Sequence, residues 1–115
     1  MSRTPQEVFE QHVKALLTGD PDTVLLDYTD DSVVITPAGV ARGKDAIRKA
    51  FVTLLEDLPE AAWQLKTQIF EGDLLFLEWT AEAALHRVDD GVDTFVFRDG
   101  MIFAQTFRYT LQPKS

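Results

Sequence analysis

The sequence predicts an α+β fold, in which three N-terminal helices pack against a curved, mostly antiparallel sheet. Two observations carry this prediction. Up to Pro59, apolar residues recur at helical spacing between capping and proline signals. After Pro59, apolar and polar residues alternate, and the alternation is interrupted at Gly72, Asp90-Gly91 and Asp99-Gly100. Helices followed by hairpins are typical of a sheet that buries one face against the helices.

The first helix is predicted to begin after Thr4. Pro5 fits the first helical position, Glu7 completes a capping box with Thr4, and Gly19 supplies a left-handed stop. His12 lies within the apolar stripe of this helix. The stripe consists of Val8, Phe9, Val13, Leu16 and Leu17.

Two further helices are predicted before Pro59. Asp20-Pro21 repeats the cap-then-proline signal and begins a short helix that ends before a turn at Asp30-Asp31, with Tyr28 near its end. The third helix runs from Lys44 to about Asp57, because Ile47, Phe51 and Leu54 recur at helical spacing and Pro59 ends the pattern.

Five strands are predicted. The β-branched segment Ser32–Thr36 is a short or edge strand closed by Pro37, and Gly39 and Gly43 mark a loop after it. Four strands joined by tight hairpin turns follow the third helix. They are Ala62–Phe70, Leu74–His86, Val92–Arg98 and Met101–Leu111.

Composition excludes several classes of function. The chain has 115 residues, so we expect one domain over residues 1–115, and its net charge of -8 disfavours nucleic acid and anionic membrane surfaces as partners. It has no cysteine, which excludes disulfides and thiol catalysis. No leader and no apolar run of ~18 residues is present, so we expect a soluble, cytoplasmic protein.

Metal and cofactor motifs are also missing from the sequence. His12 and His86 are too few and too far apart for a metal site, and no metal is expected. The sequence has no phosphate-binding glycine loop and no dinucleotide fingerprint, so no cofactor is expected either.

The order of the elements and four short motifs resemble the nuclear transport factor 2-like superfamily, and within it the SnoaL-like proteins and ketosteroid isomerases. The motifs are Leu17-Thr18-Gly19-Asp20, Tyr28-Thr29-Asp30-Asp31-Ser32, Gly43-Lys44-Asp45-Ala46-Ile47 and Phe97-Arg98-Asp99-Gly100-Met101-Ile102. The resemblance covers about residues 5–111. It implies a single SnoaL-like domain with a cystatin-like cone, in which a strongly curved sheet wraps around the helices. The superfamily includes isomerases, cyclases, epoxide hydrolases, dehydratases and binders without catalysis, so the resemblance implies a fold and not a reaction.

The resemblance also assigns three positions by comparison with ketosteroid isomerases. Those enzymes use an aspartate base, and they hold the enolate with a tyrosine and a protonated aspartic acid. In this sequence His12 stands at the tyrosine position, Thr36 at the base position and Asp93 at the second donor position. A threonine hydroxyl cannot accept a proton near neutral pH, which argues against steroid isomerisation by that mechanism.

Two readings stay open for His12 and for Asp93. His12 is either a hydrogen-bonded core histidine or a titratable group that lines a cavity. Asp93 shares a strand face with Phe95 and Phe97, where burial would raise its pKa and make it an acid or a donor to a carbonyl. Alternatively, Asp93 belongs to the Asp89-Asp90-Gly91 turn and faces water.

Glu78 depends on strand register. In the register of the isomerases, the face with Phe76, Glu78 and Thr80 lines the cone, and Glu78 is a replacement base. A one-residue bulge would reverse both faces, and the apolar face with Trp79 is the more natural core. On the last strand Gln105 and Tyr109 share a face and are candidate orienting donors.

These residues lead to one functional hypothesis and one alternative. The cavity is expected to bind a small, largely apolar molecule, and an enzyme would transfer a proton at a carbonyl compound with His12 or Glu78 as base and Asp93 as acid or oxyanion donor. The remaining pocket residues are predicted to be Tyr28, Thr36, Phe51, Phe76, Thr80, Phe95, Gln105, Phe107 and Tyr109. The alternative is a ligand-binding or assembly domain without catalysis. A homodimer through the outer sheet face is expected in either case.

Overall fold

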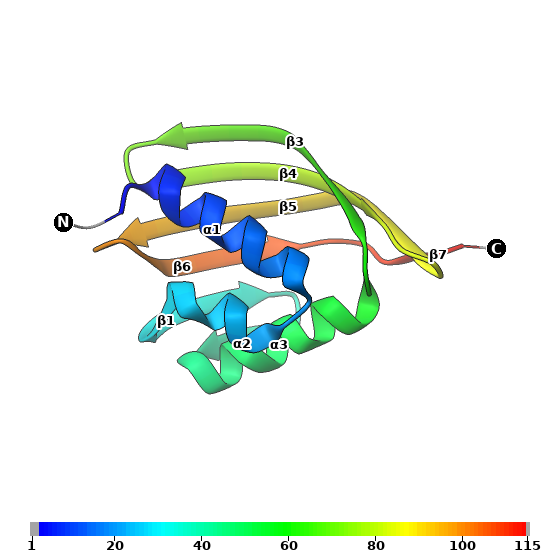
Figure 1. Ribbon diagram of the computed structural model, residues 1–115, viewed down its shortest axis with the longest axis horizontal. Helices are drawn as coiled ribbons and strands as arrows, with labels where there is room; N and C mark the ends of the chain where they lie inside the picture. Colours follow the sequence, from blue (N-terminus) through cyan, green and yellow to red (C-terminus); the bar gives the residue numbers. More distant parts are fainter. Residues whose placement is uncertain (1–2, 115) are drawn as a thin grey trace.

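The computed structural model describes residues 3–114 and has the predicted α+β architecture. Its strands are β1 (Tyr28–Thr36), β2 (Gly39–Arg42), β3 (Ala62–Glu71), β4 (Leu74–Glu82), β5 (His86–Arg98), β6 (Met101–Arg108) and β7 (Gln112–Pro113). Its helices are α1 (Pro5–Thr18), α2 (Pro21–Val24), a 3-10 helix (Leu25–Asp27) and α3 (Lys44–Asp57). The strands form one curved sheet in the order β2-β1-β6-β5-β4-β3, with β7 paired to β5. Figure 1 shows α1 lying across one face of the long strands, with α2 and α3 beside it near β1.

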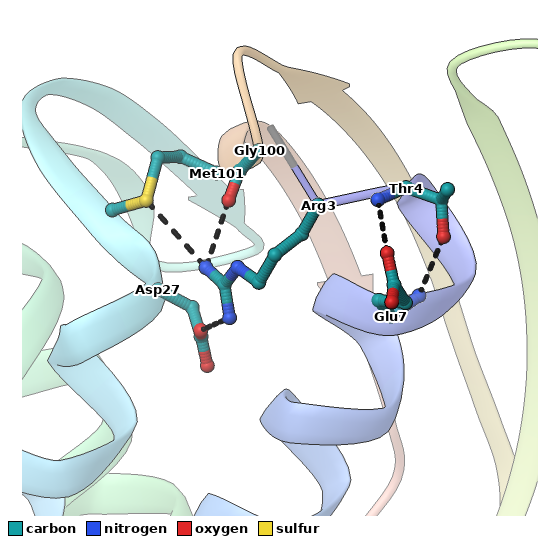
Figure 2. Close-up of polar contacts among 6 residues, drawn as sticks. All are labelled: Arg3, Thr4, Glu7, Asp27, Gly100 and Met101. Carbon is teal, nitrogen blue, oxygen red and sulfur yellow. Dashed lines mark hydrogen bonds and ion pairs between the residues drawn. The ribbon is translucent and has the colours of Figure 1, made fainter. Parts of the chain in front are cut away.

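Helix α1 begins as the sequence predicts. Thr4 accepts a hydrogen bond from the backbone N–H of Glu7 at 3.1 Å, and the Glu7 carboxylate accepts one from the backbone N–H of Thr4 at 2.8 Å (Figure 2). Gly19 ends the helix with a φ of 72°. The buried face consists of Val8, Phe9, His12 and Ala15, so the core-facing stripe is rotated away from Leu17.

Arg3 ties the start of α1 to two distant segments (Figure 2). Its Nη1 donates to Oδ1 of Asp27 at 3.0 Å, and its Nη2 donates to the backbone oxygen of Gly100 at 2.8 Å. Burial raises the pKa of Asp27, and the bond and charge of Arg3 act in the opposite direction. The second oxygen of this carboxylate is buried and has no hydrogen-bond partner among residues 3–114.

The region around β1 differs from the prediction. Strand β1 begins at Tyr28 and runs through Asp30-Asp31, where the sequence predicts a turn. Between Gly39 and Gly43 the chain forms β2, which pairs antiparallel with β1 through Val33↔Arg42 to Thr36↔Gly39, in place of the predicted loop. Both glycines have positive φ and bend the chain at the two ends of β2, and the residues between them remain extended.

The turn between β4 and β5 lies at a different place from the one predicted. Strand β5 continues through Asp90-Gly91, and the chain turns at residues 83–85. Gly91 is required for packing and not for a turn, because a Cβ at this position would lie 2.2 Å from Cε2 of Trp79. The register shifts between Trp79↔Gly91 and Ala81↔Val88, so β5 carries a bulge at Asp89 and Asp90.

The buried face of β4 is the apolar one. Leu75, Leu77 and Trp79 point toward the helices, and Phe76 and Glu78 are exposed on the outer face. The bulge lies in β5 and leaves the alternation of β4 unchanged over this stretch. Within residues 3–114, no helix combines the length and the apolar character needed to cross a membrane.

Candidate functional site

A small cavity lies between α1 and the inner face of the sheet. Its volume is about 50 Å³, and its walls are mostly apolar and aromatic. Three polar side chains reach this wall, namely His12 from α1, Asp93 from β5 and Gln105 from β6. Of the pocket residues predicted from the sequence, Phe51, Phe95 and Phe107 also line it.

Asp93 is buried at the centre of the sheet and accepts two hydrogen bonds. Nε1 of Trp79 donates to Oδ1 at 2.7 Å, and Nε2 of Gln105 donates to Oδ2 at 2.8 Å. Burial raises the pKa of Asp93 from 3.8 to about 7, and the two hydrogen bonds reduce the rise because they favour the carboxylate. Asp93 therefore lies inside the cone and not in a solvated turn.

Tyr28 fixes the orientation of Gln105. The Tyr28 hydroxyl donates to Oε1 of Gln105, so the amide nitrogen of Gln105 faces Asp93. Tyr28 is fully buried, and burial raises its pKa well above the usual range, with the charges of Asp93 and Asp27 acting in the same direction. Tyr28, Gln105, Asp93 and Trp79 thus form one continuous hydrogen-bond chain across β1, β6, β5 and β4.

His12 stands among four aromatic rings. Its ring centroid lies 5.4 Å from Phe95, 5.9 Å from Phe51 and 6.1 Å from Tyr28. Phe9 completes the set at 6.4 Å. Burial lowers the pKa of His12 from 6.5 to about 4, so the ring is neutral at pH 7. Its Nδ1 is buried without a hydrogen-bond partner among the described residues, so His12 is not the satisfied core histidine of the first reading.

Three predicted site residues lie on the outer side of the sheet. Glu78 and Phe76 are exposed, and Thr80 borders an outer hollow beside Gln64 and Lys66. The prediction of Glu78 as a replacement base is therefore wrong. The physical reason is the period of two along β4, since burying Trp79 turns both neighbours to the other face.

Thr36 and Tyr109 also lie outside the inner cavity. Both border a separate surface hollow together with Asp57. The Tyr109 hydroxyl donates to Oδ2 of Asp57 at 2.9 Å, and its ring stacks on Phe107, so it lies behind the cavity wall. Burial raises the pKa of Tyr109 above its usual value, and the hydrogen bond to Asp57 and the charge of Asp57 act in the same direction. Neither residue is placed to orient a ligand at Asp93.

Trp79 is a candidate site residue that the sequence pattern assigns only to the core. The available signal is the polar N–H of its indole, which needs a partner when the ring is buried. That partner is Asp93. Trp63 of β3 lies against Trp79, with ring centroids 5.2 Å apart, and also lines the cavity. Among residues 3–114 no three metal-ligating side chains are grouped so that they could hold a metal ion.

Comparison with protein families places the chain in a known group. The sequence profile of the SnoaL-like domain matches residues 9–105. The chain belongs to the SnoaL-like family. No curated protein sequence matches this SnoaL-like protein.

Solved structures share its fold at low sequence identity. The epoxide hydrolase/cyclase-like enzyme SalBIII, which is associated with pyran ring formation in the polyether salinomycin, has a TM-score of 0.78 at 17% identity, covering 96% of this chain and 95% of that one. IdmH from Streptomyces antibioticus, a candidate polyketide cyclase, has a TM-score of 0.74 at 16% identity, covering 93% and 92%. A nuclear transport factor 2-like protein of unknown function from Burkholderia xenovorans has a TM-score of 0.73 at 21% identity, covering 96% and 85%. Because these identities are low, the three structures show only that the SnoaL-like protein has the same fold.

Proposed function

We propose that the protein binds a small, largely apolar carbonyl compound in the inner cavity and moves a proton on it. The observation that carries the proposal is that Asp93 and His12 both line one apolar cavity. Asp93 has a pKa of about 7, so near neutral pH it exists both as a carboxyl group and as a carboxylate. A group of this kind can accept and return a proton at the pH of a cell.

The two groups take different roles in this reaction. The Asp93 carboxylate accepts a proton from the carbon next to the carbonyl, which leaves an enolate, and returns the proton to a carbon of that enolate. A neutral imidazole has one N–H donor, and His12 supplies it to the enolate oxygen. Trp79 and Gln105 hold the carboxylate in place through their hydrogen bonds. Structures with the same fold that are associated with cyclase chemistry support an enzymatic reading of the cavity.

The test is α-hydrogen exchange of butanone in deuterated water, followed by NMR. We expect the wild type to accelerate exchange and Asp93→Asn to lower that acceleration by about 100-fold or more. Glu78→Gln is the matched control, because Glu78 is a carboxylate of the neighbouring strand that faces the other side. Its exchange rate should equal that of the wild type.

Binding is measured separately through the indole N–H signal of Trp79. If butanone shifts this signal but wild type and Asp93→Asn exchange at the same rate, the protein is a binder and the proton-transfer proposal fails. If exchange is fast in both Asp93→Asn and the wild type and slow in Glu78→Gln, the assignment of Asp93 is overturned.

A second proposal concerns the outer face of the sheet, which we propose pairs with a second copy of this chain. Ile69 pairs with Phe76 across β3 and β4, and both are exposed, at 59% and 41%. Leu74 on the same face is also exposed. Apolar side chains gathered on one side of a sheet are typical of an interface. We expect a dimer of the wild type and a monomer of Phe76→Glu in sedimentation at micromolar concentration, and a monomeric wild type would contradict the proposal.

A further inference from the structure

We infer that the ligand is an elongated, uncharged molecule whose carbonyl end lies at Asp93 and whose apolar body leaves the cone between α1 and β3 into an outer groove. The inference rests on the proposed function in that it takes the inner cavity as the site.

The inner cavity alone is too small for a typical ligand. Its volume of about 50 Å³ corresponds to a few water molecules, whereas small-molecule sites in proteins have roughly 300–1,000 Å³. A ligand held at Asp93 must therefore extend beyond the inner cavity, unless it has only a few heavy atoms.

A second hollow continues the cavity toward the surface. This outer groove has a volume of about 390 Å³ and lies where α1 and α3 end and β3 begins. Leu16, Leu17 and Trp63 line both the inner cavity and the outer groove, so the two spaces share a wall at these side chains, which we call the meeting point. With the groove included, the volume falls within the range of small-molecule sites.

The meeting point is apolar and partly exposed. Leu17 is 65% exposed at the end of α1, and Leu65 of the edge strand β3 is 38% exposed and lines the inner cavity opposite it. An apolar group that covers these exposed leucines removes their surface from water, which favours binding. An alkyl chain passing between Leu17 and Trp63 would cover them.

The charge of the groove selects against anions. Glu60 lines the outer groove, and the whole chain has a net charge of -8. A carboxylate at the outer end of the ligand would meet this negative potential, whereas a neutral chain or hydroxyl would not. The ligand is therefore an uncharged carbonyl compound with a long apolar body and not a fatty acid.

The experiment titrates methyl ketones from butanone to dodecanone into the ¹⁵N-labelled protein. Trp79 reports the inner cavity and Trp63 the meeting point, and Trp63→Phe assigns their two indole signals. We expect butanone to shift the Trp79 signal, and we expect the shift of the Trp63 signal to grow with chain length as the ketone extends past the meeting point. The Kd should fall about fourfold for each added methylene until the groove is filled, and decanoate should bind more weakly than decanone.

Leu17→Glu places a charge at the meeting point on an exposed side chain, where it does not disturb the core. Leu26→Glu is the matched control, because Leu26 is also 65% exposed and lines neither space. Leu17→Glu should raise the Kd of decanone at least ten times more than it raises that of butanone, because decanone passes the meeting point and butanone does not, and Leu26→Glu should change neither.

Each outcome decides between the two proposals. If butanone shifts the Trp79 signal but chain length and Leu17→Glu have no effect, the elongated ligand is overturned and the proposed site remains. If decanoate binds as tightly as decanone, the assignment of an uncharged ligand is overturned. If no ketone shifts the Trp79 signal, the inner cavity is not a carbonyl site and the proposed function fails with it.

Discussion

Burial shifts the two titratable side chains of the cavity in opposite directions. It disfavours the charged form of each, which is the carboxylate of Asp93 and the imidazolium of His12. The stability that Asp93 contributes is fully present below pH 3.8 and is lost as the pH rises through about 7. The stability that His12 contributes is fully present above pH 6.5 and is lost as the pH falls through about 4. Between these values the two effects offset each other.

Asp93→Asn removes one of the two opposing effects. We expect the free energy of unfolding of this variant to fall more steeply than that of the wild type when the pH is lowered from 7 to 4. The difference between the two curves should change by on the order of 4 kcal/mol, which is the shift of Asp93 converted at 1.36 kcal/mol per unit. Urea denaturation at several pH values measures it. Parallel curves would show that Asp93 titrates normally in the folded protein.

Gly91 has a packing role that can be measured in the same way. A methyl group at this position would collide with the indole ring of Trp79, so Gly91→Ala should lower the free energy of unfolding by about 1–3 kcal/mol. In a Trp79→Leu background the same substitution should cost less, because the ring is absent. Equal costs in the two backgrounds, measured as a double-mutant cycle, would contradict this contact.

At this scale the sequence predicts the inward residues of β5, and on α1 it predicts Val8, Phe9 and His12 but not the exposure of Leu17. Asp93 and Phe95 share a face because side chains alternate, and His12 falls within an apolar helical stripe. It does not predict the environment of Glu78, because alternation along β4 allows either face to point inward, and the burial of Trp79 decides between them. The link between Trp79 and Asp93 was also beyond reach, because it joins residues on two strands whose register was unknown.

At the scale of the elements, Arg3 ties the segment before α1 to Asp27 and Gly100. Removing the guanidinium in Arg3→Ala leaves the buried carboxylate of Asp27 without its donor. We expect a loss of about 1–3 kcal/mol at pH 7 and a smaller loss at acid pH, where Asp27 is protonated. Asp27→Asn in the same chain should restore part of the loss.

Arg48→Ala is the control for this prediction. Arg48 pairs with Asp22 at 2.8 Å, but both side chains are exposed, so its loss should cost less than about 1 kcal/mol. Thermal or urea denaturation distinguishes the two variants. Equal losses would mean that the pair between Arg3 and Asp27 is no stronger than a surface ion pair.

Helices were predicted more closely than hairpins. The capping box at Thr4, the stop at Gly19 and the bounds of α3 are local features, and all are present in the structure. Glycine is ambiguous within a sheet, because it permits a turn and also permits close packing. At Gly91 packing decides, and this depends on a tryptophan of the neighbouring strand.

At the scale of the whole molecule, the buried hydroxyl of Ser32 joins β1, from the first third of the chain, to β6, near its end. Oγ of Ser32 donates to the backbone oxygen of Ile102 at 2.6 Å and accepts from the backbone N–H of Thr29 at 2.9 Å. It lies where the pairing of β1 with β6 shifts register between Tyr28 and Val33. Ser32 is fully buried, so no water replaces these bonds.

Ser32→Ala should lower the free energy of unfolding by about 1–3 kcal/mol, because the buried backbone oxygen of Ile102 and the half-buried N–H of Thr29 lose their partner. Thr53→Ala is the control, since the Thr53 hydroxyl bonds only within its own helix and is exposed. Denaturation of both variants measures the difference. A Ser32→Ala variant as stable as Thr53→Ala would show that water enters the β1–β6 seam.

The parallel pairing of β1 with β6 also sets the order in which the chain can fold. Val34 pairs with Gln105, so β1, which is synthesised early, cannot form this pairing until β6 has been synthesised. Contacts between such distant segments form slowly, because a long loop has to close first. Until β6 leaves the ribosome, the face of α1 that contains His12 lacks its packing against β6. A nascent chain of this protein therefore exposes its future cavity wall, and a chaperone that recognises apolar helices would meet it there first.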